Sequence, residues 1–131
     1  METVETGLVG EATSVVTDEH TAERWGSGLV PVFGTPSLVG LMENAAVEAL
    51  DGYLPAEQTS VGGRMDVRHL APTPIGMHVR ARAELLETEG RRLVFHIEAW
   101  DDVERIGEAT HERFIIELES FVAKAKAKGS Q

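Results

Sequence analysis

Residues 35–51 alternate between apolar and polar positions with the period of an amphipathic helix. The predicted apolar face consists of Leu38, Val39, Met42, Ala45, Ala46, Ala49 and Leu50. Thr35 offers a capping hydroxyl, Pro36 suits the first helical position, and Gly52 ends the helix. A single helix with such a face needs a sheet to bury it.

Period-two alternation predicts strands on both sides of that helix. The expected strands are residues 7–17, 60–70, 77–87, 91–101 and 104–116, and residues 117–128 form a charged helix. Residues 18–34 are expected to be a long irregular connection, of the kind that often forms lids or binding loops. The sequence therefore predicts a single α+β domain over residues 1–131, with a curved antiparallel sheet wrapped around one central helix.

The composition narrows the class of protein. The 131 residues are 42% hydrophobic and 26% charged, and they include no cysteine, so disulfides and cysteine nucleophiles are excluded. A net charge of −10 argues against nucleic acid as the main partner. No apolar run is long enough for a membrane span, and the first residues do not resemble a signal peptide. A cytoplasmic protein with no membrane partner is predicted, and the histidines show no metal-binding spacing.

Glu43 lies beside apolar residues of the predicted helix, at offsets of three, four and seven. An ionised carboxylate in such a place is costly unless it is paired or hydrogen-bonded. Glu43 therefore either meets a donor at the helix edge or acts as a base or nucleophile in a cleft.

His69 ends the strand predicted over residues 60–70. Strict alternation groups it with Val61, Gly63, Met65 and Val67 on the face expected to meet the helix. An inward histidine is either a structural residue or a proton-transfer group.

Thr35, Gly62 and Arg113 each allow a structural and a functional interpretation. Thr35 fits a helix cap, and eight residues of helix place it about 12 Å from Glu43. If the helix begins at Thr35, a site containing both residues must cross a dimer interface. Gly62 fits either a β-bulge or a backbone N–H that can stabilise an oxygen on which negative charge develops. Arg113 fits an ordinary cross-strand salt bridge.

The connection before the helix is apolar for a surface loop. Its apolar residues are Trp25, Leu29, Val30, Val32 and Phe33. They either cap the core or face a substrate, because binding pockets are mostly apolar too.

The stretches VFGTPSLVGLMENAAVEAL, VRHLAPTPIG, ETEGRRL and IGEATHERFII together resemble the fluoroacetyl-CoA thioesterase family of the hot-dog thioesterases. The resemblance covers residues 7–126. It implies a hot-dog fold and hydrolysis of a small acyl-CoA thioester, without a metal or redox cofactor. It also implies a homodimer, with a tetramer as the larger alternative.

The resemblance also implies roles for single residues. The family's catalytic threonine, glutamate and histidine correspond to Thr35, Glu43 and His69. A glycine that lines the thioester carbonyl site corresponds to Gly62, and a ligand-binding arginine corresponds to Arg113.

One position departs from the family pattern. The gating phenylalanine of the fluoroacetate-handling members has its best match in Leu29, so selectivity for a fluorinated substrate is not implied. Leu29 and Phe33 are the expected substrate contacts in the loop. Two other functions stay open at this stage: an enoyl-CoA hydratase on the same fold, and a non-catalytic module that binds acyl-CoA.

Overall fold

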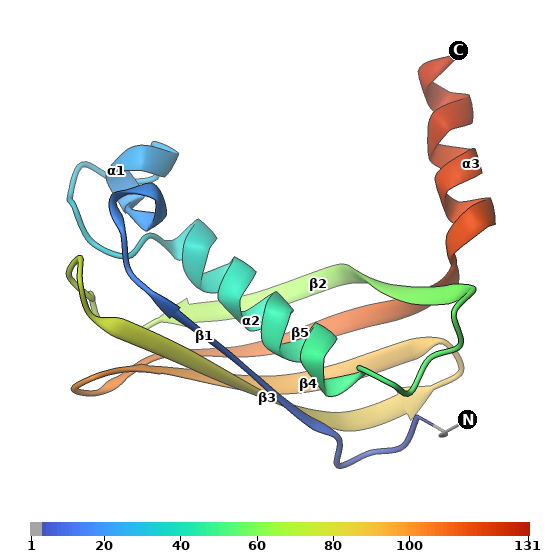
Figure 1. Ribbon diagram of the computed structural model, residues 1–131, viewed down its shortest axis with the longest axis horizontal. Coiled ribbons are helices and arrows are strands. Elements are labelled where there is room, and N and C mark those ends of the chain that lie inside the picture. The colour runs from blue at the N-terminus through green and yellow to red at the C-terminus, as the bar shows by residue number, and fades with distance from the viewer. Residues whose placement is uncertain (1–3) are drawn as a thin grey trace.

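The computed structural model describes residues 4–131 and shows a curved, five-stranded antiparallel sheet that holds one long helix (Figure 1). The elements are β1 (Val9–Val15), η1 (Asp18–His20), α1 (Ala22–Trp25), α2 (Thr35–Ala49), β2 (Gln58–His69), β3 (His78–Glu89), β4 (Arg92–Asp101), β5 (Arg105–Glu117) and α3 (Leu118–Gly129). The strand order β1-β3-β4-β5-β2 places β1 and β2 at the two edges of the sheet. The predicted α+β arrangement is confirmed.

The core lies between α2 and the concave face of the sheet. Buried helix residues such as Leu38 and Met42 join buried strand residues such as Leu85, Phe95 and Ile97 in one apolar cluster. The helix also rests on the edge strand β1. A Cβ atom added to Gly10 would lie 2.2 Å from the backbone nitrogen of Ala49, so this close approach requires glycine.

The start of α2 differs from the prediction. Gly34 is the N-cap residue and Thr35 is the first helical residue, so the assignment of Thr35 as a cap was wrong. The expectation of an irregular segment over residues 18–34 was also wrong in part. Two short helices, η1 and α1, occupy residues 18–20 and 22–25 of this segment. The Thr35 hydroxyl is consequently free to bond to another element.

β2 contains a bulge, which overturns the predicted face of its first half. The pairing of β2 with β5 shifts between Gly62 and Arg64. A Cβ atom added to Gly63 would meet the ring of Phe114, whereas one added to Gly62 would lie 2.9 Å from Glu43 Oε2. Gly62 therefore faces α2 and Gly63 does not, because a bulge reverses the alternation. The interpretation of these glycines as a bulge is confirmed.

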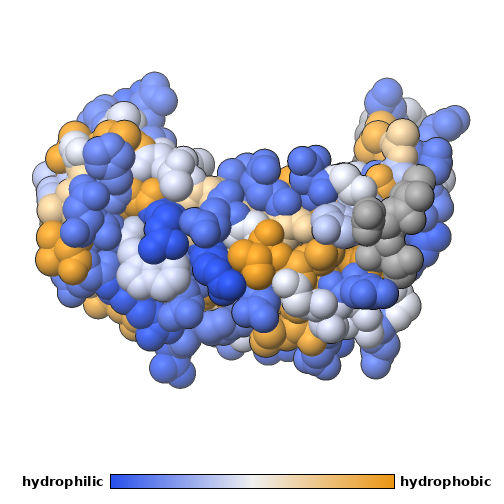
Figure 2. All heavy atoms as spheres, turned by 60° about the horizontal axis from the view of Figure 1, so that its bottom comes forward, coloured by the Kyte–Doolittle hydropathy of each residue, from blue (hydrophilic) through white to orange (hydrophobic). Residues whose placement is uncertain are grey.

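The two ends of the molecule rise on the same side. α1 lies at one end, and α3 projects from the other end, beyond β5 (Figure 1). The space-filling view shows a hollow between the two raised ends (Figure 2). Within residues 4–131, none of the helices combines the length and the hydropathy needed to cross a bilayer.

Candidate active site

Thr35 and His69 meet where α2 begins and β2 ends. Thr35 Oγ1 lies 2.8 Å from His69 Nδ1. His69 Nε2 is buried and has no hydrogen-bond partner among residues 4–131. Both side chains line a cleft of about 400 Å³, together with loop residues that include Gly28, Val30 and Phe33. An unpartnered ring nitrogen beside a cleft is available for proton transfer to a bound molecule.

Burial sets the charge of the His69 ring. Desolvation lowers the pKa of His69 below its ordinary value of 6.5. The ring is therefore neutral at neutral pH, and it can either donate or accept a proton at Nε2.

Glu43 belongs to a second cluster, around the middle of α2. Its Oε2 lies 3.8 Å from Nη1 of Arg113, which projects from β5. The carboxylate can reach this position because Gly62, on the neighbouring strand β2, has no side chain there. His111, also on β5, contacts Arg113 through Nε2. The carboxylate that the helical pattern leaves among apolar residues thus has a cationic partner.

The structure keeps the two clusters apart. Gly62 and His69 are seven positions apart on β2, which corresponds to about 20 Å of extended strand. Glu43 lies at the Gly62 position and Thr35 at the His69 position. Within one chain, Thr35 and His69 therefore come together, and Glu43 does not join them.

Two histidines, the buried His111 and the half-buried His69, predict a loss of stability in mild acid. Burial is the main cause that lowers the pKa of both His69 and His111 below 6.5. The unfolded chain then binds more protons than the folded chain just below pH 6.5, so the free energy of unfolding rises with pH up to about 6.5 and levels off above it. We expect urea unfolding to show lower stability at about pH 5.5 than at about pH 7.5.

The control for this effect is His111→Gln, which removes one titrating group. This variant should show a smaller difference in unfolding free energy between the two pH values. Asp101, Glu108 and Glu112 have lowered pKa values that start from 3.8 or 4.5, so their contribution is lost at lower pH. Equal stability of the unmodified protein at both pH values would contradict the prediction.

The loop before α2 places its two predicted substrate contacts differently. Phe33 is buried and lines the cleft beside Thr35. Leu29 is 93% exposed. The Trp25 indole N–H donates to Ser37 Oγ over 2.8 Å, which ties α1 to the first turn of α2. A substrate contact by either residue stays a prediction.

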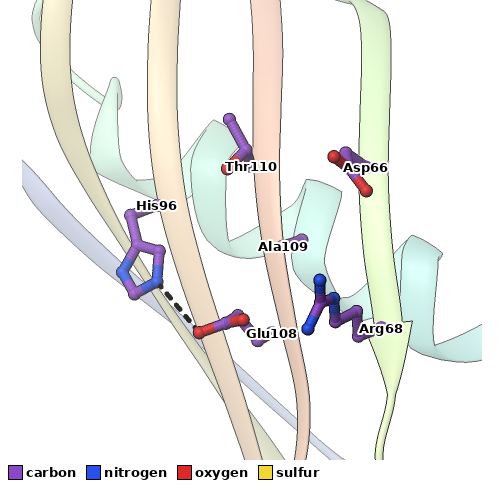
Figure 3. Close-up of a pocket in the computed structure, with 6 residues that line it drawn as sticks. All are labelled: Asp66, Arg68, His96, Glu108, Ala109 and Thr110. Atoms are coloured by element: carbon purple, nitrogen blue, oxygen red, sulfur yellow. Dashed lines mark ion pairs between the residues drawn. The ribbon is translucent and has the colours of Figure 1, made fainter.

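The opposite face of the sheet carries a depression lined by charged side chains. Figure 3 shows Asp66 and Arg68 from β2, His96 from β4, and Glu108 from β5, with α2 behind the sheet. His96 Nε2 lies 3.7 Å from Glu108 Oε2, and Glu108 also pairs with Arg105. His96, Glu108 and Arg105 thus form one paired group.

Most of the other arginines on the sheet are also paired. The pairs are Arg64–Glu112, Arg80–Glu11, Arg82–Glu84, Arg91–Glu117 and Arg92–Glu112. The two pairs with Glu112 are partly buried, and the other three are exposed to solvent, where an ion pair contributes little to stability.

Two comparisons of the sequence with known proteins indicate the family of this chain. A family model described as fluoroacetyl-CoA-specific thioesterase matches residues 16–119. A fluoroacetyl-CoA thioesterase of Streptantibioticus cattleyicolor is 47% identical over 97 residues, which are 74% of this chain and 70% of that protein.

Solved structures resemble the fold over nearly the whole chain. A phenylalanine-to-alanine mutant of the fluoroacetyl-CoA-specific thioesterase FlK matches with a TM-score of 0.91 at 37% identity, covering 98% of this chain and 99% of that chain. A threonine-to-serine mutant of FlK in complex with acetyl-CoA gives 0.90 at 37% identity, with 95% and 98% covered. A hot-dog-like protein from Thermanaerovibrio acidaminovorans gives 0.84 at 25% identity, with 94% and 91% covered. The predicted hot-dog fold is confirmed.

Proposed function

Because the chain belongs to the fluoroacetyl-CoA-specific thioesterase family, we propose that it hydrolyses a small acyl-CoA thioester to the free acid and CoA. The observation that carries the proposal is the Thr35–His69 hydrogen bond beside the cleft, with Nε2 of His69 left without a partner in the described chain. The acetyl-CoA bound in the FlK mutant supports a short acyl-CoA as the ligand.

The proposed site also includes Glu43, taken from a second copy of the chain. β2 is an edge strand, and within residues 4–131 it is hydrogen-bonded to β5 on one side alone. An unpaired edge is a template for another strand. Antiparallel pairing of two β2 strands about an axis near Met65 and Asp66 brings His69 of each chain opposite Gly62 of the other. Glu43 lies beside Gly62, so this homodimer supplies the missing carboxylate to each Thr35–His69 pair.

His69 serves in this proposal as the proton donor to the leaving group. When Nδ1–H donates to the Thr35 hydroxyl oxygen, Nε2 of the neutral ring is a proton acceptor. Nε2 takes the proton that the attacking water gives up, directly or through Glu43. As the C–S bond breaks, its electron pair goes to sulfur, the imidazolium gives this proton to the CoA thiolate, and the ring is neutral again. Thr35 thus orients the ring and fixes its tautomer.

Glu43 supplies the other half of the reaction by one of two routes. In the first, its carboxylate attacks the thioester carbonyl, and water later cleaves the mixed anhydride to give the free acid. In the second, it takes a proton from the water that attacks the carbonyl. Both routes consume one water and release one acid and one thiol. Neither route needs a metal or a redox cofactor, and the backbone N–H of Gly62 is the proposed donor to the carbonyl oxygen.

Thiol release from a panel of acyl-CoA thioesters tests the proposal. We expect the purified protein to release CoA from short saturated acyl thioesters, and we expect CoA itself to accumulate in step with the free acid. A matched thioester of a long acyl chain controls for chain length. The ratio of kcat/KM for fluoroacetyl-CoA and acetyl-CoA measures selectivity for the fluorinated substrate, which the leucine at position 29 does not imply.

Two other outcomes would replace the proposal. A hydratase would add water to an enoyl-CoA and release no thiol from a saturated substrate. A binding module would raise the unfolding temperature in the presence of CoA esters without any thiol release.

A further inference from the structure

Two polar side chains from β5 lie buried beneath Glu43. His111 is 1% exposed and Arg113 is 5% exposed, and both belong to the face of β5 that meets α2. A buried cation and a buried imidazole are costly unless each polar atom has a partner. Their partners show what the two side chains do there.

Arg113 is held at three of its donor positions. Its Nε donates to Ser60 Oγ over 2.8 Å, and Nη2 donates to the Ser60 carbonyl oxygen over 2.9 Å. Nη1 lies 3.1 Å from His111 Nε2. The same Nη1 lies 3.8 Å from Glu43 Oε2. Nη1 carries two N–H groups, so one can donate to His111 while the other points to the Glu43 carboxylate.

The contacts of His111 determine its proton arrangement. Nδ1 lies 2.8 Å from the Arg64 carbonyl oxygen, which can only accept a hydrogen bond. Nδ1 therefore carries the proton. Nε2 is then the acceptor for Arg113, so the ring must be neutral while both bonds exist. Burial, together with the charge of Arg113, lowers the pKa of His111, and the bond to Arg64 opposes them.

We propose that His111 is a positioning residue, which as a neutral imidazole accepts a hydrogen bond from Arg113 and so fixes one guanidinium N–H against Glu43. The role of Glu43 in thioester hydrolysis is the proposed function, on which the catalytic part of this inference rests. A donor fixed before the reaction stabilises a carboxylate in one orientation without having to reorganise when charge moves. Without the acceptor, a buried N–H is left unsatisfied and the guanidinium turns to find another partner.

Two substitutions of His111 separate its two hydrogen bonds. In His111→Gln, the side-chain oxygen replaces Nε2, so the acceptor for Arg113 is kept. In His111→Asn, the side-chain amide replaces Nδ1, so the donor to Arg64 is kept and the acceptor for Arg113 is lost. A residue that only fills space would tolerate both amides to a similar degree.

The kinetic test compares kcat and KM of the two variants on the best thioester of the panel. We expect His111→Asn to lower kcat by about 10- to 100-fold, because the carboxylate loses its fixed orientation, and to change KM by less than about threefold. His111→Gln should restore at least about one third of the kcat. Equal losses in both variants, or full activity in His111→Asn, would overturn the proposal. If His111→Asn does not fold, His111→Leu, whose apolar side chain offers Arg113 no acceptor, takes its place, and unchanged kcat in His111→Leu overturns the proposal.

A spectroscopic test needs no activity. The ¹⁵N signals of Arg113 Nη1 and Nη2 should be separate in the unmodified protein and in His111→Gln, because rotation of a clamped guanidinium is slow. In His111→Asn the two bonds to Ser60 remain, so the two signals should exchange measurably faster than in His111→Gln without having to merge. Arg113→Lys assigns these signals by removing them. An inactive protein with slow exchange of the Arg113 signals would refute the proposed function and leave the clamp standing, whereas equal exchange rates in His111→Asn and His111→Gln would refute the clamp itself.

Discussion

Replacing Glu43 with alanine is expected to lower kcat for thioester hydrolysis by about 10³-fold. The carboxylate is the proposed nucleophile or base, and alanine can serve in neither role. The change should appear in kcat rather than in KM, because the carboxylate acts on the reacting carbonyl. Initial rates of thiol release over a range of substrate concentrations measure both constants.

The same substitution should leave the fold intact. The Glu43 side chain is 43% exposed, and its distance to Arg113 is 3.8 Å, so the ion pair contributes only about 1 kcal/mol. Arg113 keeps its bonds to Ser60 and His111 in the variant. A drop in activity would therefore report chemistry rather than unfolding, and thermal unfolding followed by circular dichroism checks this directly.

Glu48→Ala is the matched control on the same helix. Glu48 is exposed, and it lies next to the depression bounded by the end of α2 and the start of β2. Its removal takes away the same charge but should change kcat by less than about twofold. Similar losses in the two variants would assign the effect to net charge. Full activity of Glu43→Ala would remove Glu43 from the mechanism.

The fold could be predicted because its main signals are local. The apolar spacing of α2 and the alternation along β3, β4 and β5 each depend on neighbours in sequence. The start of the helix could not be fixed in the same way. Thr35 and Gly34 are both acceptable caps, and the contact that distinguishes them is the bond from Thr35 to His69, 34 residues away.

The face of Gly62 was predicted wrongly because one residue of β2 is left out of the ladder. Alternation is reliable only while every residue pairs with one on the neighbouring strand. The bulge between Gly62 and Arg64 shifts this count, and the residues before it change faces. The two adjacent glycines, Gly62 and Gly63, indicated a bulge, but they did not show which of them is left without a partner on β5.

His111 was not predicted as a site residue, because its burial cannot be read from the sequence. Its position two residues before Arg113 places both on one face, and the sequence showed this. Both faces of β5 mix polar and apolar residues, so the pattern did not show which face is buried. The partners that make burial tolerable are Ser60 and the backbone of Arg64, on a different strand. Such pairing is not a local property of the sequence.

In the proposed dimer, the separation of Glu43 from His69 predicts that two inactive variants complement each other. His69→Gln should lower kcat by about 10²- to 10³-fold, since Nε2 no longer transfers the proton. Two differently tagged chains, one with Glu43→Ala and one with His69→Gln, can be coexpressed and the heterodimer isolated by both tags. One of its two sites then combines an intact Glu43 with an intact His69, so we expect about half of the unmodified activity per dimer.

A second heterodimer gives the reciprocal result. It pairs an unmodified chain with a chain that carries both substitutions. If Glu43 acts on the partner's Thr35–His69 pair, each site of this dimer contains one damaged group, and activity should be near zero. If both groups of a site came from the same chain, the unmodified chain would keep its site and about half of the activity would remain, while the first heterodimer would be inactive. The two dimers contain the same substitutions in equal number, so any difference between them arises from which chain carries each group. About 20 Å of β2 between Gly62 and His69 makes the first outcome the expected one.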